Sequence, residues 1–174
     1  MLFFVIFGAQ LFSAFINTAD LPGQTLTWIQ SLDLSAMGVM AIILLFYIAF
    51  GCVFSAFALV LLTVPVFYPL VAGLGLDVLF TTSPENVLIW FGIVIVVVAE
   101  IGQITPPIGM NVFVLKSMLP DVSLSTIFKG IVPFFGADLV RLALIVLFPS
   151  TVLILPDYMD QIQDQLDAFF DALF

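Results

Sequence analysis

Residues 102–111 read Gly-Gln-Ile-Thr-Pro-Pro-Ile-Gly-Met-Asn and interrupt a strongly apolar part of the chain. The two adjacent prolines remove two backbone donors, and the first of them forces Thr105 out of the α-helical region. Gly102 and Gly109 permit unusual backbone dihedrals on either side. We therefore predict a transmembrane helix over 88–117 that is broken near the midplane of the bilayer. A proline kink that serves packing alone is the competing interpretation.

The composition of the whole chain indicates a membrane protein. Of its 174 residues, 63% are hydrophobic and 9% are charged, and the mean hydropathy is +1.32. An ordinary soluble domain is about 45–50% apolar and about 25% charged. A soluble protein of this size has too little interior to bury so many apolar side chains. We predict an all-α polytopic membrane protein.

The distribution of charges divides the chain into segments. Residues 34–76 form a run of 43 uncharged residues. One membrane-spanning helix needs about 20 residues, so this run holds two passes, or one pass and a re-entrant hairpin. The predicted segments are a span with an interfacial stretch (1–33), a span with a re-entrant hairpin (34–77), a loop or insertion (78–87), the broken helix (88–117), a loop with the final span (118–156) and an acidic amphipathic tail (157–174).

Charges and chain ends suggest how the protein is oriented in the membrane and whether the chain is a fragment. Two of the three cations lie at 116–129, which we expect to be a cytoplasmic loop before a final span at 130–155. Met1 leads directly into apolar residues without a basic region, so a signal peptide is not expected. A chain that begins inside a span suggests a fragment or one half of a split protein. The acidic tail is expected either to contact a partner or to form a solvated cap at the end of the chain.

Several function classes are disfavoured by residues that the chain lacks. It contains no histidine and one cysteine, Cys52, so a multi-cysteine metal site and the commonest general base are excluded. With three Lys and Arg residues, a nucleic-acid surface is not expected. We do not expect an enzyme.

The broken helix is typical of a transporter binding site. Unwound backbone at membrane depth is tolerated only where protein covers it or where it lines a cavity. Freed carbonyls and the Thr105 hydroxyl are hard oxygen ligands that suit a small cation such as Na⁺, and half-helix N-termini favour an anionic substrate group. Gly51 allows a second break, with Ser55 one turn later; close helix packing is the other interpretation of this glycine.

Three charged residues lie within predicted spans. Asp138 and Arg141 are spaced i, i+3, so we expect a neutralised structural pair. Glu100 remains open to two interpretations. It is either a proton or ion site, or a residue of the bundle interior beside Gln103.

Motifs between Leu11 and Pro156 resemble the large membrane subunit of tripartite ATP-independent periplasmic (TRAP) transporters. In chain order the matching pieces are Gly51 with Leu61-Leu62-Thr63-Val64-Pro65-Val66-Phe67-Tyr68-Pro69, Trp90-Phe91-Gly92, Ile101-Gly102, Thr105-Pro106-Pro107-Ile108-Gly109-Met110-Asn111-Val112-Phe113-Val114, Pro120-Asp121-Val122, Gly130-Ile131-Val132-Pro133-Phe134, Phe148-Pro149 and Leu155-Pro156.

The resemblance implies the C-terminal half of a Na⁺-coupled permease in the bacterial inner membrane, with no cofactor beyond the coupling ion. The implied fold is one repeat of an inverted-repeat, elevator-type transporter. The implied partners are a small membrane subunit, a periplasmic binding protein that delivers an organic acid such as a C4-dicarboxylate, and the missing first repeat. The implied Na⁺ ligands are oxygens of Gly51, Gly102, Thr105 and the carbonyl of Ile108. Candidate substrate or cavity residues are Ser55, Gln103, Pro106, Pro107 and Asn111.

Two departures from the family pattern and two rival functions stay open. Ser55 stands where family members usually carry an acidic residue, and 78–87 resembles an insertion. The rivals are another ion-coupled carrier, for example one driven by protons through Glu100, and a truncated, non-transporting fragment. The substrate also stays open between a C4-dicarboxylate, sialic acid and other organic acids.

Overall fold

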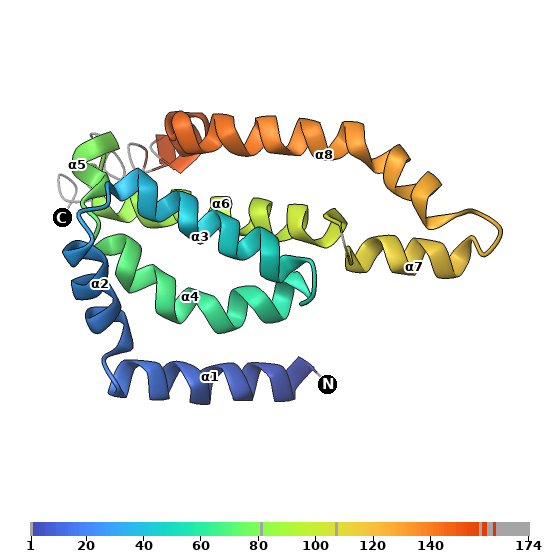
Figure 1. Ribbon diagram of the computed structural model, residues 1–174. Coiled ribbons are helices and arrows are strands. Elements are labelled where there is room, and N and C mark those ends of the chain that lie inside the picture. The colour runs from blue at the N-terminus through green and yellow to red at the C-terminus, as the bar shows by residue number, and fades with distance from the viewer. Residues whose placement is uncertain (1, 81, 107, 157, 160–161, 163–174) are drawn as a thin grey trace, which may run out of the picture.

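The computed structural model describes residues 2–80, 82–106, 108–156, 158–159 and 162, and most of the predicted acidic tail lies outside them. Within these ranges the chain forms helices and no strand, so the all-α prediction is confirmed there (Figure 1). The helices are α1 (Leu2–Thr18), α2 (Leu21–Ser31), α3 (Ala36–Gly51), α4 (Ala56–Ala72), α5 (Leu76–Phe80), α6 (Pro84–Ile104), α7 (Met110–Met118) and α8 (Leu124–Leu147). A further helical stretch covers 150–156.

Helix α6 is the centre of the fold. The hairpin of α3 and α4 packs against it on one side, α8 packs against it on the other, and α1 lies outside α4 (Figure 1). The side chains of α6 that are almost completely buried are Trp90, Phe91, Val94, Ile95, Val98, Ala99 and Ile101. The stretch before the proline break is therefore held on both sides by packed helices.

Helices α6 and α8 are long and apolar enough to cross a membrane. Taken as one segment, helices α1 and α2 are also long and apolar enough to cross a membrane, but they are bent by 60° at the break between them. Asp20 occupies this break with a positive φ of 51°. The described residues thus hold two candidate spans, or three if the bent pair counts as one.

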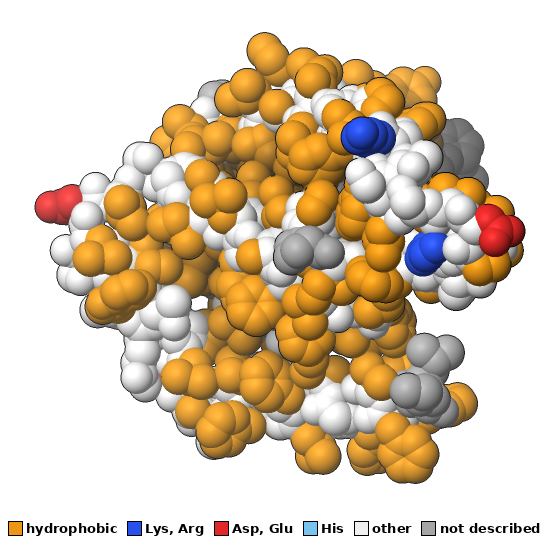
Figure 2. Space-filling view, turned by 45° about the vertical axis from the view of Figure 1, so that its right-hand side comes forward, with side chains coloured by type: hydrophobic (Ala, Val, Ile, Leu, Met, Phe, Trp, Pro, Cys, Tyr) orange, Lys and Arg blue, Asp and Glu red, His pale blue; other side chains and the backbone are white. Residues whose placement is uncertain are grey.

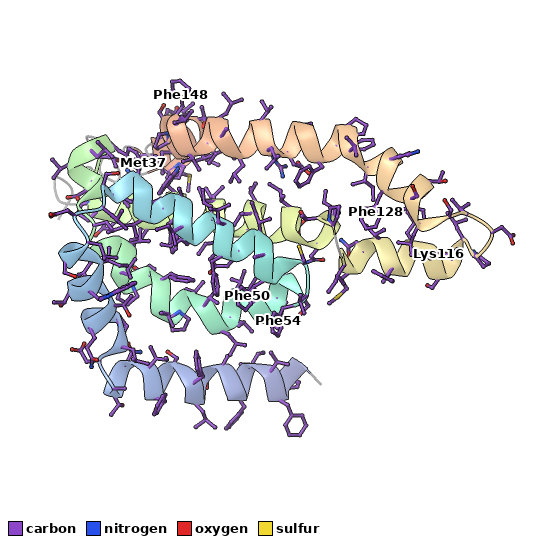
Figure 3. The ribbon with its side chains drawn as sticks, in the orientation of Figure 1. Met37, Phe50, Phe54, Lys116, Phe128 and Phe148 are labelled. Carbon is purple, nitrogen blue, oxygen red and sulfur yellow. The ribbon has the colours of Figure 1, made fainter. Side chains whose placement is uncertain are left out.

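Helices α3 and α4 are shorter, with 16 and 17 residues, and only residues 52–55 separate them. The Ser55 hydroxyl caps α4 by accepting a hydrogen bond from the Ala58 backbone N–H at 3.4 Å. The hydroxyls of Tyr47 and Thr63 hydrogen-bond each other across the hairpin. Figure 3 labels Phe50 and Phe54 near the end of the hairpin, where their rings are stacked. The rings of Phe46 and Tyr47 on α3 also pack against Phe67 on α4. Aromatic packing and the polar contact therefore hold the two helices together.

The predicted loop at 78–87 is shorter in the structure. Helix α5 occupies its first residues, and α6 begins at Pro84. The Ser83 hydroxyl caps α6 by accepting from the Asn86 N–H at 3.1 Å, and a proline at the first helical position loses no intrahelical bond. Helix α6 consequently has 21 residues and begins four residues before the predicted start of the broken helix at 88.

The predicted loop at 116–129 and span at 130–155 also have different bounds. Helix α8 begins at Leu124, because the Ser123 hydroxyl caps it by accepting from the Thr126 N–H at 3.1 Å. Lys116 belongs to α7, and its Nζ donates to the carbonyls of Pro120 and Val122, each at 2.7 Å. Since these bonds close the turn, the connection is tighter than the charge pattern indicated.

A buried hydrogen bond ties α6 to α8. Trp90 Nε1 donates to the Ile145 carbonyl at 2.8 Å, and the indole is fully buried. In a continuous helix that carbonyl would accept from residue 149, but Pro149 has no N–H. The tryptophan therefore satisfies an oxygen that the proline leaves without its helical donor, at the place where α8 ends instead of running to 155.

Hydrophobic side chains cover most of the face that Figure 2 shows, and the few charged side chains lie toward its periphery. Exposed large apolar residues occur on α1, α4 and α8, for example Phe3, Phe57 and Phe134. A surface of this kind needs lipid or further protein against it.

Candidate ion-binding site at the break between α6 and α7

The helix stops and restarts around the two prolines. Helix α6 ends at Ile104, and the extended backbone of Thr105 follows it (φ −81°, ψ 132°). The Thr105 N–H donates to the Gly102 carbonyl at 3.0 Å. Helix α7 begins after Gly109, whose φ of +55° lies in the left-handed region that glycine adopts at little cost. The break thus consists of residues 105–109.

Gly51 and Gly102, which both belong to the predicted site, touch each other. A Cβ atom on Gly102 would lie 2.7 Å from the Cα of Gly51, and one on Gly51 would lie 3.0 Å from the Cα of Gly102. Both obstacles are backbone atoms, which cannot rotate away. The close packing that we considered for Gly51 is therefore present, and it brings the C-terminal end of α3 onto the last turn of α6.

This contact brings together the C-terminal ends of α3 and α6, which both carry partial negative charge. The last carbonyls of a helix have no intrahelical donor, and each helix C-terminus carries roughly half a negative charge. In a continuous helix the N–H groups of residues 106 and 107 would bond the carbonyls of Gly102 and Gln103, but both residues are prolines. The carbonyl oxygens of Gln103 and Thr105 both lie 3.3 Å from the position that a Cβ on Gly109 would take. Neutral oxygens therefore crowd around the break.

The Thr105 side chain adds a hydroxyl to these oxygens. Its Oγ1 donates to the Ile101 carbonyl at 2.6 Å. Since the single hydroxyl proton is used in this bond, the lone pairs of Oγ1 remain available to a cation or a donor.

Cys52, which no motif in the sequence singled out, also lies at the break. Its Sγ lies 3.1 Å from the Ile48 carbonyl and 3.9 Å from the Pro106 carbonyl, so it joins the tip of the hairpin to the break. Its position directly after Gly51 was the only signal in the sequence.

The remaining predicted residues are more dispersed. Gln103 is half-buried in the last turn of α6, while Pro106 and Ile108 are exposed within the break. Ser55 caps α4, and Asn111 is exposed in the first turn of α7. No hydrogen bond between described residues links Ser55 or Asn111 to Thr105. Pro107 lies outside the described residues.

The charged residues of the spans do not belong to the break itself. Arg141 and Asp138 form the predicted ion pair on α8 with a distance of 3.0 Å, and that prediction is confirmed. Glu100 is exposed and lines a cavity between α4 and α6. No three His, Cys, Asp or Glu side chains gather in the described part of the chain. The oxygens around the break are therefore neutral, which suits a hard monovalent ion better than a transition metal.

Comparison with known proteins identifies the family. Residues 1–151 match the family described as "Tripartite ATP-independent periplasmic transporter, DctM component". The chain is 30% identical over 159 residues to the C4-dicarboxylate TRAP transporter large permease protein DctM of Pseudomonas aeruginosa, which covers 91% of this chain and 35% of the relative. It is 32% identical over 154 residues to a putative TRAP transporter large permease protein of Haemophilus influenzae, with 88% and 36% covered.

A third relative has a different substrate in its name. The sialic acid TRAP transporter large permease protein SiaM of Vibrio cholerae is 26% identical over 153 residues, which are 88% of this chain and 33% of the relative. The chain spans about a third of the length of these curated relatives. No solved structure matches it significantly. The chain is a multi-pass membrane protein that belongs to the DctM component family of the TRAP transporters, a family of transporters and not of enzymes.

Proposed function

We propose that this chain forms the C-terminal half of the large permease subunit of a Na⁺-coupled TRAP transporter that imports an organic acid across the bacterial inner membrane. The contact between Gly51 and Gly102 carries the proposal, because it joins two negative helix ends beside the Thr105 hydroxyl. The tripartite family supports three partners: a small membrane subunit, a periplasmic binding protein, and the first repeat of the permease.

The proposed Na⁺ ligands are the carbonyl oxygens of Gly51, Gly102 and Ile108 together with the Thr105 hydroxyl. Each belongs to a helix end or to the break, where backbone oxygens lack a full set of helical donors. The Gly102 carbonyl accepts one hydrogen bond from the Thr105 N–H, and a carbonyl has a second lone pair for an ion. Neutral ligands suit an ion that must be released again during each transport cycle.

The lengths of α3 and α4 support a re-entrant hairpin. At 1.5 Å per residue, helices of 16 and 17 residues reach about 24–26 Å. The hydrocarbon core is about 30 Å thick, so these helices suit a hairpin that enters and leaves on one side. With α6 and α7 as a discontinuous helix, this makes one repeat of an inverted-repeat, elevator-type carrier.

The proposed substrate is a carboxylate, with a C4-dicarboxylate as the first candidate. Helix α7 begins directly after the break, and the free N–H groups of a helix N-terminus attract an anion. Gly109, at the cap of α7, makes no side-chain capping bond. The candidate cavity residues are Ser55, Gln103, Pro106, Pro107 and Asn111. The named substrates of the relatives, C4-dicarboxylate and sialic acid, are both organic acids.

The experiment is uptake into proteoliposomes that contain the full-length permease, its small subunit and its binding protein. Radiolabelled succinate and sialic acid are offered under an imposed Na⁺ gradient or, separately, under a proton gradient without Na⁺. We expect uptake of one acid with the Na⁺ gradient only. Uptake driven by protons, and lost in Glu100→Gln, would instead support the proton-driven carrier. Absence of uptake of any acid offered by the cognate binding protein would contradict the proposed transport function.

A further inference from the structure

A cavity with apolar walls and one acid lies between α4 and α6. It has a volume of about 330 Å³. Its lining residues are Ala56, Phe57, Val60 and Leu61 from α4 and Val96, Ala99 and Glu100 from α6. These spacings place each set on one face of its helix. Among the described residues, Glu100 is the only charged one that lines it.

Glu100 lies far from either polar end of its helix. It is about 24 Å along α6 from Pro84, at 1.5 Å per residue. On the other side, α7 continues beyond the break for about 14 Å before the polar turn at 119–123 (Figure 1). An ionised carboxylate at such a depth is costly unless a cation pairs with it.

The cations of the described chain do not supply that partner. The only ion pair among the described residues joins Arg141 to Asp138. Lys116 donates to the carbonyls of Pro120 and Val122 at the α7–α8 turn, where Figure 3 labels it. An ionised Glu100 would therefore take its partner from another part of the protein.

We propose that a lysine or arginine side chain from the part of the permease outside this chain fills this cavity and forms an ion pair with Glu100. This rests on the proposed function only in that the chain is part of a longer permease, as its coverage of about a third of its relatives supports.

The chemistry of the cavity selects a basic side chain. The alkyl stem of lysine or arginine packs against apolar walls while its charged head reaches a carboxylate. A bare Na⁺ ion needs several oxygen ligands, whereas the described residues that line this cavity present almost no polar surface to it.

The ion pair would also lie next to the proposed Na⁺ site. The Ala99 carbonyl, which immediately precedes Glu100 in the chain, is 3.3 Å from the position of a Cβ on Gly51. The basic side chain would therefore fasten the rest of the permease to the helices that meet at the glycine contact.

The test measures thermal unfolding of the full-length permease in lipid nanodiscs. Glu100→Gln removes the charge with little change of shape and leaves the buried cation unpaired. We expect the Tm to fall by about 5–10 °C. Glu85→Gln is the control, because Glu85 is exposed in the first turn of α6; we expect its Tm to stay unchanged.

The partner is then sought by neutralising, in the Glu100→Gln background, each lysine and arginine of the predicted spans outside this chain. We expect one substitution to methionine to restore the Tm. If Glu100→Gln is not recovered as folded protein, the same second substitution must restore its expression.

Three results would overturn the proposal: an unchanged Tm in Glu100→Gln, rescue by none of the neutralising substitutions, or loss of Na⁺-dependent stabilisation without such rescue. The last would identify Glu100 as an ion ligand. Because unfolding needs no substrate or gradient, failure of Na⁺-coupled uptake in the unmodified protein would refute the proposed function and leave this result standing.

Discussion

Gly51 and Gly102 are in backbone contact, so closely that a methyl group on Gly102 would lie 2.7 Å from the Cα of Gly51. One residue ends α3 and the other lies in the last turn of α6. Their contact joins the hairpin to the broken helix and is the geometric basis of the proposed ion site.

Gly102→Ala is predicted to destabilise the permease. The added methyl meets backbone, so the two helices must separate, at a cost of about 1–3 kcal/mol in the free energy of unfolding. Chemical denaturation of the full-length protein measures this cost. Gly92→Ala on the same helix is the matched control, because nothing lies within 4 Å of its Cβ position. Equal stability of the two variants would show that α3 and α6 do not touch at the glycines.

Gly109→Ala is predicted to weaken Na⁺ binding. Alanine at a φ of +55° is strained by about 1–3 kcal/mol, and its methyl would press on the carbonyls of Gln103 and Thr105 at 3.3 Å. We expect a higher Na⁺ concentration for half-maximal stabilisation against heat. Gly130→Ala, with nothing within 4 Å, should behave as the parent protein. A Na⁺ dependence unchanged by Gly109→Ala argues against ligands at this break.

Trp90→Phe tests the bond between α6 and α8. Phenylalanine keeps most of the apolar volume but leaves the Ile145 carbonyl without the indole donor. An unsatisfied buried carbonyl costs about 1–3 kcal/mol, which we expect as a loss of unfolding free energy. Trp28→Phe is the comparison, since Trp28 is 63% exposed. The prediction fails if both variants unfold alike.

The hydroxyls of Tyr47 and Thr63 are predicted to be energetically coupled. The Thr63 hydroxyl donates to the Leu59 carbonyl at 2.7 Å, so it accepts from the Tyr47 hydroxyl. A double-mutant cycle of Tyr47→Phe and Thr63→Val should give a coupling of about 1 kcal/mol in unfolding free energy. Tyr68→Phe, at an exposed position of α4, should leave stability unchanged. Additive single effects would mean that the hairpin does not depend on this bond.

The residues that break helices were readable in the sequence, whereas the contacts between helices were not. Consecutive prolines at 106 and 107 dictate an interruption wherever they occur, because they lack the N–H groups that a helix needs. Gly102, Thr105 and Gly109 flank these prolines in the sequence, so they were also expected to lie at the interruption. The contact of Gly51 with Gly102 depends on how the hairpin crosses α6, which no local pattern encodes.

The predicted helix boundaries were wrong where a capping serine starts a helix within a polar stretch. The polar residues near 83 and 123 predicted long loops, but serine at both positions caps the following helix. The hydrogen bond from Trp90 to the Ile145 carbonyl could not be predicted from the sequence either. It requires α8 to pack on α6 so that the carbonyl left free by Pro149 faces the indole. Cys52 carried no motif of its own, and its contact with Pro106 follows from the fold alone.

The most direct test of the proposed Na⁺ site compares Thr105→Ala with Thr105→Ser in reconstituted uptake as the Na⁺ concentration is varied. Alanine removes the hydroxyl oxygen, and serine keeps it. We predict that Thr105→Ala raises the Na⁺ concentration for half-maximal uptake about tenfold, equivalent to about 1.4 kcal/mol, and that Thr105→Ser stays close to the parent protein. An unchanged Na⁺ dependence in Thr105→Ala would contradict a sodium site at this break.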